Sequence, residues 1–126
     1  MPDQPNPPTP SGPRILALVR DLMFSGRIAA EARAASVAFK IVRDPAQLPS
    51  AGDGVLLLVD LNLPGATDAA AAWRAAHSLP VVGFVSHVDA AAIAHAREVG
   101  LDKVMARSQF VSVLPEMLAS LAAAPG

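Results

Sequence analysis

The strongest structural signal in the sequence is an unbroken aliphatic run at residues 55–59, which ends abruptly in the carboxylate of Asp60. An apolar run of this length without polar alternation is typical of a strand that is covered on both faces. Similar segments predict four more strands, at residues 15–19, 39–42, 81–85 and 103–106. The chain is therefore expected to build a sheet that lies in the middle of a layered domain.

Alanine-rich segments between these runs predict helices at residues 22–36, 68–77, 89–99 and 111–124. Residues 44–54 contain two prolines and two glycines, so this connection is expected to be a loop or at most one or two helical turns. Strands that alternate with crossovers in this way pair in parallel. The sequence thus predicts an α/β fold with a doubly wound, five-stranded parallel sheet between two layers of helices.

Single residues are expected to mark the helix ends. Ser25 is a candidate cap for the first helix, and Thr67 or Asp68 is expected near the start of the second. Gly100 is expected to end the third helix. Pro115 is expected in the first turn of the last helix, where its missing N–H costs least.

The chain has 126 residues, the length of one domain. Half of its 12 prolines lie in residues 1–13, a segment without hydrophobic periodicity that predicts a disordered, extended tail. The folded domain is expected to span residues 14–126 as a stand-alone unit without an attached effector. The sequence has no cysteine, which excludes disulfides and thiolate zinc sites.

The formal net charge of −1 and the lack of a Lys/Arg-rich stripe argue against nucleic-acid binding. The longest apolar runs fall far short of the roughly 20 residues that a membrane-spanning helix requires. Residues 1–8 have neither the basic nor the apolar region of a signal peptide. The expected location is the cytoplasm, without membrane association.

Chemically active side chains follow four of the predicted strands: Arg20 and Asp21, Asp60 and Asn62, Ser86 and His87, and Arg107 with Ser108. In an open doubly wound sheet, ligands bind outside the carboxyl ends of the strands, so these side chains are expected to converge in one pocket. A carboxylate in such a pocket can act as a nucleophile toward a phosphoryl donor, provided that a cation balances the developing charge.

With these residues the chain resembles the receiver domains of bacterial two-component response regulators, over residues 14–122. The resemblance implies a flavodoxin-like receiver fold and a role in a signalling phosphorelay. Residues 59–65 look like the segment around the family's phosphoacceptor, which makes Asp60 the candidate phosphoacceptor and Asn62 the residue whose carbonyl binds Mg²⁺. Asp21 matches a metal ligand of the family, and Ser86 matches its switch hydroxyl.

Four positions depart from the family's pattern. Arg20 stands in place of the first pocket acid, and Arg107 stands in place of the lysine. Ser108 follows where the family usually has a cis-proline, and Val104 stands where strand five often carries an aromatic residue. Because two acids then face two arginines, a divalent cation gains little Coulomb energy, and Mg²⁺ binding is expected to be weak or absent. Arg20 is also expected to pair with Asp60 and lock it. The hypothesis is a degenerate receiver, or pseudo-receiver, that is not an enzyme and acts by protein–protein interaction.

The resemblance implies a protein partner, either a histidine kinase or a downstream signalling protein. It also implies a homodimer through the face formed by the family's helix 4, strand 5 and helix 5, at about residues 90–124. Two other functions stay open. One is a conventional receiver that a histidine kinase phosphorylates on Asp60. The other is a small nucleotide- or flavin-binding enzyme, although no glycine-rich loop follows the first strand.

Each candidate residue also has a purely structural interpretation. Asp21 and Asp60 can cap the turns that follow their strands, and Ser86 can cap the next helix. Arg107 can pair with Asp60 for structure alone, and His87 can be a solvated loop residue.

Three apolar residues are expected to serve packing. Trp73 is predicted to be partly buried against the sheet. Met23 and Phe24 are predicted to be core or lid residues, and their exposure would instead mark a binding patch.

Overall fold

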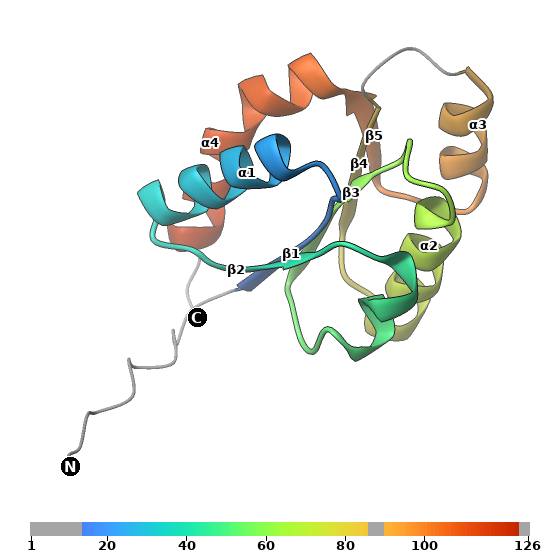
Figure 1. Cartoon of the computed structure of the whole chain (residues 1–126), viewed down its shortest axis with the longest axis horizontal. Coiled ribbons are helices and arrows are strands. Elements are labelled where there is room, and N and C mark those ends of the chain that lie inside the picture. Colours follow the sequence, from blue (N-terminus) through green and yellow to red (C-terminus); the bar gives the residue numbers. More distant parts are fainter. Residues whose placement is uncertain (1–13, 86–89, 124–126) are drawn as a thin grey trace.

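All five predicted strands are present and pair in parallel in one sheet, in the order β2-β1-β3-β4-β5. The computed structural model describes residues 14–85 and 90–123 (Figure 1). The strands are β1 (Arg14–Leu18), β2 (Ala38–Val42), β3 (Leu56–Asp60), β4 (Val81–Val85) and β5 (Lys103–Ala106). The predicted tail at residues 1–13 lies outside the described residues.

Two layers of helices cover the sheet, which confirms the predicted α/β architecture (Figure 1). The helices are α1 (Leu22–Ala34), α2 (Ala66–His77), α3 (Ala90–Glu98) and α4 (Arg107–Ala123), with one 3-10 helix, η1 (Pro45–Ser50). Helices α1 and α4 pack on one face of the sheet, and η1, α2 and α3 pack on the other. In the described ranges, no helix is long and apolar enough to cross a bilayer.

The starts of α1 and α2 differ from the prediction. The N-cap of α1 is Asp21, whose carboxylate accepts hydrogen bonds from backbone N–H groups of the first turn, whereas Ser25 is buried one turn further on. Helix α2 begins directly after Gly65, which has φ +82°, so Thr67 and Asp68 lie inside its first turn. Gly65 is needed there because a left-handed backbone angle strains residues that carry a Cβ.

Helix α4 begins four residues earlier than predicted, at Arg107. The early start places Phe110 on the buried face, in line with Leu114 and Leu118, and all three side chains are fully buried. The prediction that Pro115 lies in the first turn was therefore wrong, because it lies in the helix interior. The predicted end of α3 is confirmed: Gly100 has φ +89°, and the N–H of Leu101 returns to the carbonyl of Ala96.

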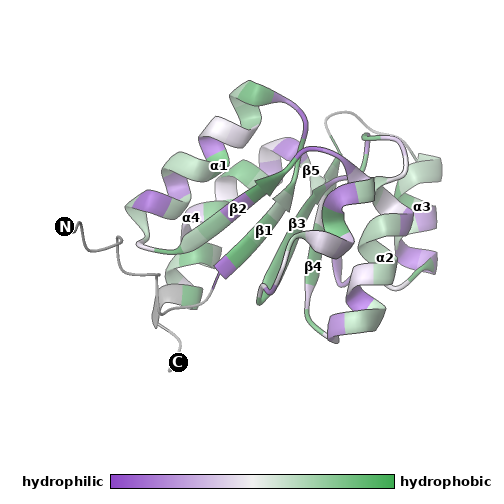
Figure 2. Cartoon of the chain, turned by 60° about the horizontal axis from the view of Figure 1, so that its bottom comes forward, coloured by the Kyte–Doolittle hydropathy of each residue, from purple (hydrophilic) through white to green (hydrophobic). Residues whose placement is uncertain are grey.

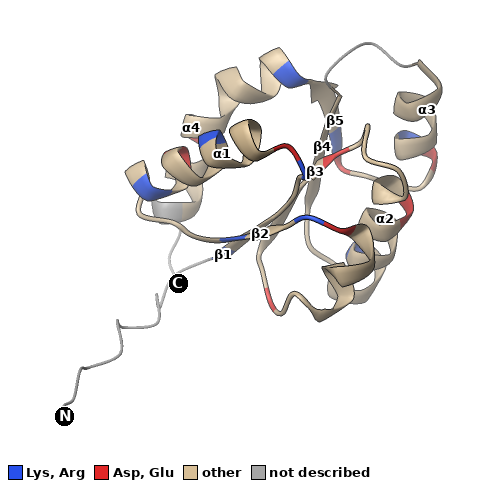
Figure 3. Cartoon of the chain, in the orientation of Figure 1, with Lys and Arg blue, Asp and Glu red and all other residues tan. Residues whose placement is uncertain are grey.

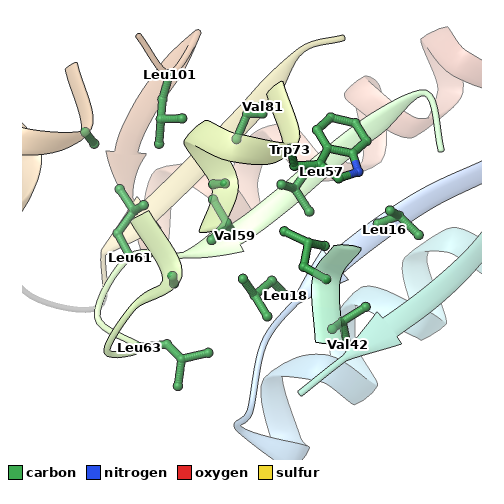
Figure 4. Packing of buried hydrophobic residues seen from close by; sticks show 14 of the residues in the cluster. Leu16, Leu18, Val42, Leu57, Val59, Leu61, Leu63, Trp73, Val81 and Leu101 are labelled. Carbon is green, nitrogen blue, oxygen red and sulfur yellow. The ribbon is translucent and has the colours of Figure 1, made fainter. Parts of the chain in front are cut away.

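The side chains of the sheet alternate between two apolar clusters, as a sheet covered on both faces requires. Leu16 and Leu18 pack with Leu57, Val59 and the indole of Trp73 on the α2 side (Figure 4). Trp73 is only 3% exposed, so it is more deeply buried than predicted. Figure 2 shows the same pattern: the strands are mostly hydrophobic, apart from a hydrophilic patch at the start of β1, and the hydrophilic patches recur along the helices.

Three aromatic rings pack against one another in the apolar cluster on the α1 and α4 side of the sheet. The ring of Phe84 on β4 lies 5.0 Å from that of Phe24 on α1 and 4.5 Å from that of Phe110 on α4. Pairs at these separations add to the energy of apolar burial. The contact joins the carboxyl half of β4 to the first turns of both helices on this face.

Candidate functional site

The strand register brings the predicted site segments to one edge of the sheet. Leu18 at the end of β1 pairs with Val59, and Asp60 at the end of β3 pairs with Phe84. Val85 at the end of β4 pairs with Ala106 at the end of β5. Because neighbouring parallel strands lie about 4.8 Å apart, the residues that follow these four ends share the carboxyl edge. Ser86 and His87, which follow β4, lie outside the described residues.

The Asp21 carboxylate contacts two backbone N–H groups and one guanidinium. Its Oδ1 accepts hydrogen bonds from the backbone N–H groups of Met23 (2.9 Å) and Phe24 (3.2 Å), and its Oδ2 lies 3.5 Å from the Arg107 guanidinium. The Phe24 N–H is the main cause that holds the pKa of Asp21 below its usual value; burial opposes it, and Met23 and Arg107 reinforce it. The capping interpretation of Asp21 is therefore confirmed, and the contact with Arg107 is additional.

Arg107 lies between a carboxylate and an aromatic ring. Its guanidinium carbon is 4.0 Å from the centroid of the Phe24 ring, a cation–π contact, and its side chain is 29% exposed. Its Nε is buried and has no hydrogen-bond partner among the described residues. The interpretation in which Arg107 pairs with Asp60 is wrong, because the acid that Arg107 contacts is Asp21.

Asp60 is the last residue of β3 and is half-buried. Its Oδ1 accepts a hydrogen bond from the backbone N–H of Asn62 (3.0 Å), and its carbonyl accepts one from the N–H of Leu63 (3.2 Å). This is the turn-capping arrangement that aspartate makes after a strand. The structural interpretation of Asp60 is thus confirmed as well, and its role as phosphoacceptor stays a prediction.

The expected ion pair between Arg20 and Asp60 is not formed. The Nε of Arg20 donates to the carbonyl of Arg43 (3.4 Å), and the Nη1 of Arg43 donates to the carbonyl of Arg20 (3.3 Å). Both residues are exposed and follow the neighbouring strands β1 and β2, so each guanidinium satisfies the backbone of the other strand end. Figure 3 shows how acidic and basic residues alternate along this edge.

The donor set at the edge does not fit a tightly bound Mg²⁺. Mg²⁺ requires octahedral oxygen ligands and gives up its water reluctantly. Asp21, Asp60 and Asn62, the predicted ligands, supply two carboxylates, and the one on Asp21 already faces a guanidinium. In residues 14–85 and 90–123, no group of three or more His, Cys, Asp or Glu side chains is placed to hold a metal ion.

Two residues of the site were missed in the sequence. Arg43 is one of them: it follows β2 as Arg20 follows β1, but the predicted site drew only on the ends of the first, third, fourth and fifth strands. Phe24 was assigned to the core or a lid, and it is both a core residue and the platform for Arg107. Met23, by contrast, is 88% exposed, and its neighbour Leu22 is 71% exposed. That exposure meets the condition for a binding patch beside the site.

No known protein-family profile and no curated protein sequence matches the chain. Its structure is nevertheless similar to solved receiver domains. The CheY-like receiver domain protein from Methanospirillum hungatei JF-1 superposes with a TM-score of 0.71 at 14% identity, covering 88% of this chain and 97% of that chain. The phosphorylated cyanobacterial phytochrome response regulator RcpA gives 0.70 at 18% identity, covering 87% and 91%.

A third similar structure is the Mn²⁺-bound form of the response regulator Rcp1, with a TM-score of 0.70 at 17% identity, covering 90% of this chain and 97% of that chain. The strand order 2-1-3-4-5 is that of flavodoxin-like sheets. The chain therefore has the flavodoxin-like fold of CheY-type receiver domains.

Proposed function

From this receiver fold and its altered carboxyl edge, we propose that the chain is a degenerate receiver, or pseudo-receiver, which signals through protein–protein contacts. Mg²⁺-dependent phosphorylation of Asp60 is weak or absent in this proposal. The observation that carries it is the position of the Arg107 guanidinium, 3.5 Å from Asp21 and stacked on Phe24. The guanidinium, a cation of the chain itself, already pairs with the carboxylate that a metal ion would need as a ligand.

The charge balance at the edge supports the proposal. Phosphoryl transfer to a carboxylate requires cations that neutralise the equatorial oxygens of the transferred group. A metal ion that enters here must compete with Arg107 for Asp21, whose Oδ1 is also occupied by two backbone N–H groups. With Arg20 in place of an acid, no further carboxylate follows β1 to compensate.

The test is phosphorylation of the full chain by acetyl phosphate with Mg²⁺, read by intact mass and by peptide mapping of Asp60. The expected result is no stoichiometric adduct, and beryllofluoride is expected to give no bound ¹⁹F signal. The matched control is the double variant Arg20→Asp, Arg107→Lys, which restores the residue types of the family. We expect this variant to gain the adduct.

A stoichiometric adduct on the unaltered chain would contradict the proposal. If the double variant also stays unmodified, the charge balance is not the cause and the physical argument fails.

The second candidate is a conventional receiver that a histidine kinase phosphorylates on Asp60. One observation favours it: Arg20 bonds to the Arg43 carbonyl and leaves the Asp60 carboxylate without the expected ion pair. The same phosphorylation experiment separates the two candidates. A nucleotide- or flavin-binding enzyme has less support, because the loop after β1 leads into a helix capped by a carboxylate, which repels phosphate.

The proposed function includes a protein partner, either a histidine kinase or a downstream signalling protein, in the cytoplasm. It also includes self-association through the surface of α3, β5 and α4, which corresponds to the family's helix 4, strand 5 and helix 5 face. β5 is an edge strand, and its outer side has no neighbour in the described sheet. Light scattering across micromolar concentrations tests the dimer, and a constant monomer mass would exclude it.

A further inference from the structure

A groove of about 630 Å³ runs between α4 and the sheet, away from the carboxyl-edge site. Its walls are apolar, with side chains from one stripe of α4 facing side chains from three strands: Val113, Met117, Leu121, Leu56, Val82 and Met105. This volume lies in the range of ligand-binding clefts. Met105, Val113, Met117 and Leu121 are each only partly buried, so the walls keep apolar surface that an occupant would cover.

The chemistry of the groove suits an apolar segment with little charge. Two of its seven apolar lining residues, which include Pro80, are methionines, whose unbranched side chains adapt to irregular surfaces. Among its charged lining residues, Asp102 is already held by Arg74 through two hydrogen bonds of 2.9 Å. Lys103 and Glu116 carry opposite charges, so the rim does not select a strongly charged partner.

One wall of the groove lies beside the start of β1, where the described part of the chain begins. Leu56, one of its wall residues, pairs in register with Ile15, the residue after Arg14. The last turn of α4, which supplies Ser120 and Leu121 to the groove, lies close to the start of β1 in both views of the chain (Figures 1 and 2). Residues 1–13 therefore join the domain beside one end of the groove.

We propose that the groove is the docking site for residues 1–13 of the same chain, bound as a polyproline II segment. Six of these 13 residues are proline, and Asp3 is the single charged side chain. Prolines present apolar surface in a preformed helix and lose little entropy on binding. The Ser11–Gly12 pair, separated from β1 by Pro13 alone, is a turn signal that lets the segment fold back. This proposal does not depend on the proposed function.

The lengths agree with this placement. The wall supplied by α4 extends from Gln109 to Leu121, which is about 18 Å at 1.5 Å per residue. A polyproline II segment rises about 3.1 Å per residue, so 13 residues reach about 40 Å. The segment can cross past the end of α4 and still follow the whole groove. Because the tether is short, the effective concentration of the segment at the groove is in the millimolar range.

The absence of cysteine from the sequence gives a direct test on the full chain. A nitroxide is attached to the variant Thr9→Cys, and methyl NMR signals are recorded from chain labelled with ¹³C at methionine methyl groups. We expect the oxidised nitroxide to abolish the signals of Met105 and Met117, and ascorbate to restore them. Met23, which does not line the groove and is 88% exposed, is expected to keep its intensity.

Two serine variants on α4 form a matched pair. Ser120 lines the groove and Ser112 does not, and both are exposed, so either arginine substitution leaves the core intact. Ser120→Arg is expected to restore the Met105 and Met117 signals beside the oxidised label. Ser112→Arg is expected to leave them lost.

Three outcomes would overturn the proposal. The first is unchanged Met105 and Met117 signals, and the second is an equal loss at Met23, as a segment without a docking site would produce. The third is a signal loss that appears when nitroxide-labelled chain without ¹³C is mixed with ¹³C-labelled chain without nitroxide, because the occupant is then a second copy.

Discussion

Replacing Asp102 with asparagine is expected to destabilise the domain by an amount that depends on pH. The Asp102 carboxylate accepts two hydrogen bonds of 2.9 Å from the Arg74 side chain and one of 2.8 Å from the backbone N–H of Val81. It thereby joins α2 to the first residue of β4 and the residue before β5. Arg74 is the main cause that lowers the pKa of Asp102 from 3.8 to about 2; burial opposes the shift, and the Val81 N–H adds to it.

The pKa difference sets the size of the effect. A shift of almost two units corresponds to about 2.5 kcal/mol at 1.36 kcal/mol per unit. Because the Asp102 side chain is 32% exposed and that of Arg74 is 42% exposed, water screens the pair, and we expect about 1 kcal/mol. For a domain of this size, such a loss lowers the Tm by about 3–6 °C.

The sign of the pH dependence follows from the lowered pKa. The carboxylate contributes its full stabilisation above the unfolded-state pKa and loses it as the pH falls through the folded-state pKa. The difference between the unaltered chain and Asp102→Asn is therefore expected to be constant above pH 5, to fall to about half near pH 3, and to vanish below the folded-state pKa of about 2.

Urea unfolding followed by the fluorescence of Trp73 measures this difference, because Trp73 is the single tryptophan and is buried. Asp53→Asn is the matched control: Asp53 is exposed, and its substitution is expected to change the free energy of unfolding very little. Equal stabilities of the two variants at pH 7 would refute the reasoning. A difference that stays constant from pH 7 to pH 3 would also refute it, because the loss would then not arise from the charge.

Two further substitutions test the packing. Gly83→Ala places a Cβ 2.7 Å from Leu61 Cδ1, so the buried Leu61, which precedes Asn62 and follows Asp60, must shift. We expect the free energy of unfolding in urea to fall by about 1–3 kcal/mol and the NMR shifts of Asn62 to change. An unchanged free energy of unfolding would show that Leu61 moves aside without cost. Pro115→Ala restores an N–H to the interior of α4 at an exposed position. We therefore expect the free energy of unfolding to rise by about 1–2 kcal/mol. A lower value would mean that the proline stabilises the fold, by restricting the unfolded chain, more than it disturbs the helix.

The strands were predictable because their signal is local. The central strands β1, β3 and β4 are apolar runs that are almost entirely buried, as strands covered on both faces are. The edge strands β2 and β5 are less buried and each contains a lysine, yet the predicted bounds of β4 and β5 are those observed. The helix starts were less predictable because they depend on tertiary contacts. The start of α4 at Arg107 follows from the packing of Phe110 against Phe24 and Phe84, which come from distant segments.

The edge that holds the site was predictable, and its ion pairs were not. Strand order and register bring the ends of β1, β3, β4 and β5 together whatever side chains follow them. The acid that Arg107 contacts is 86 residues away, and the sequence offers Asp21 and Asp60 as equally good partners. Arg20 was assigned to Asp60 on charge alone, although the free carbonyl at the end of β2 satisfies it equally well.

The stacking of Arg107 on Phe24 has a consequence for how this edge responds to its surroundings. The Arg107 guanidinium is covalently part of the chain, so a chelator cannot remove it as it would remove a bound metal ion. A divalent ion can reach the Asp21 carboxylate only by displacing this guanidinium. When free divalent ions are scarce, the edge therefore keeps a positive group of its own beside that carboxylate.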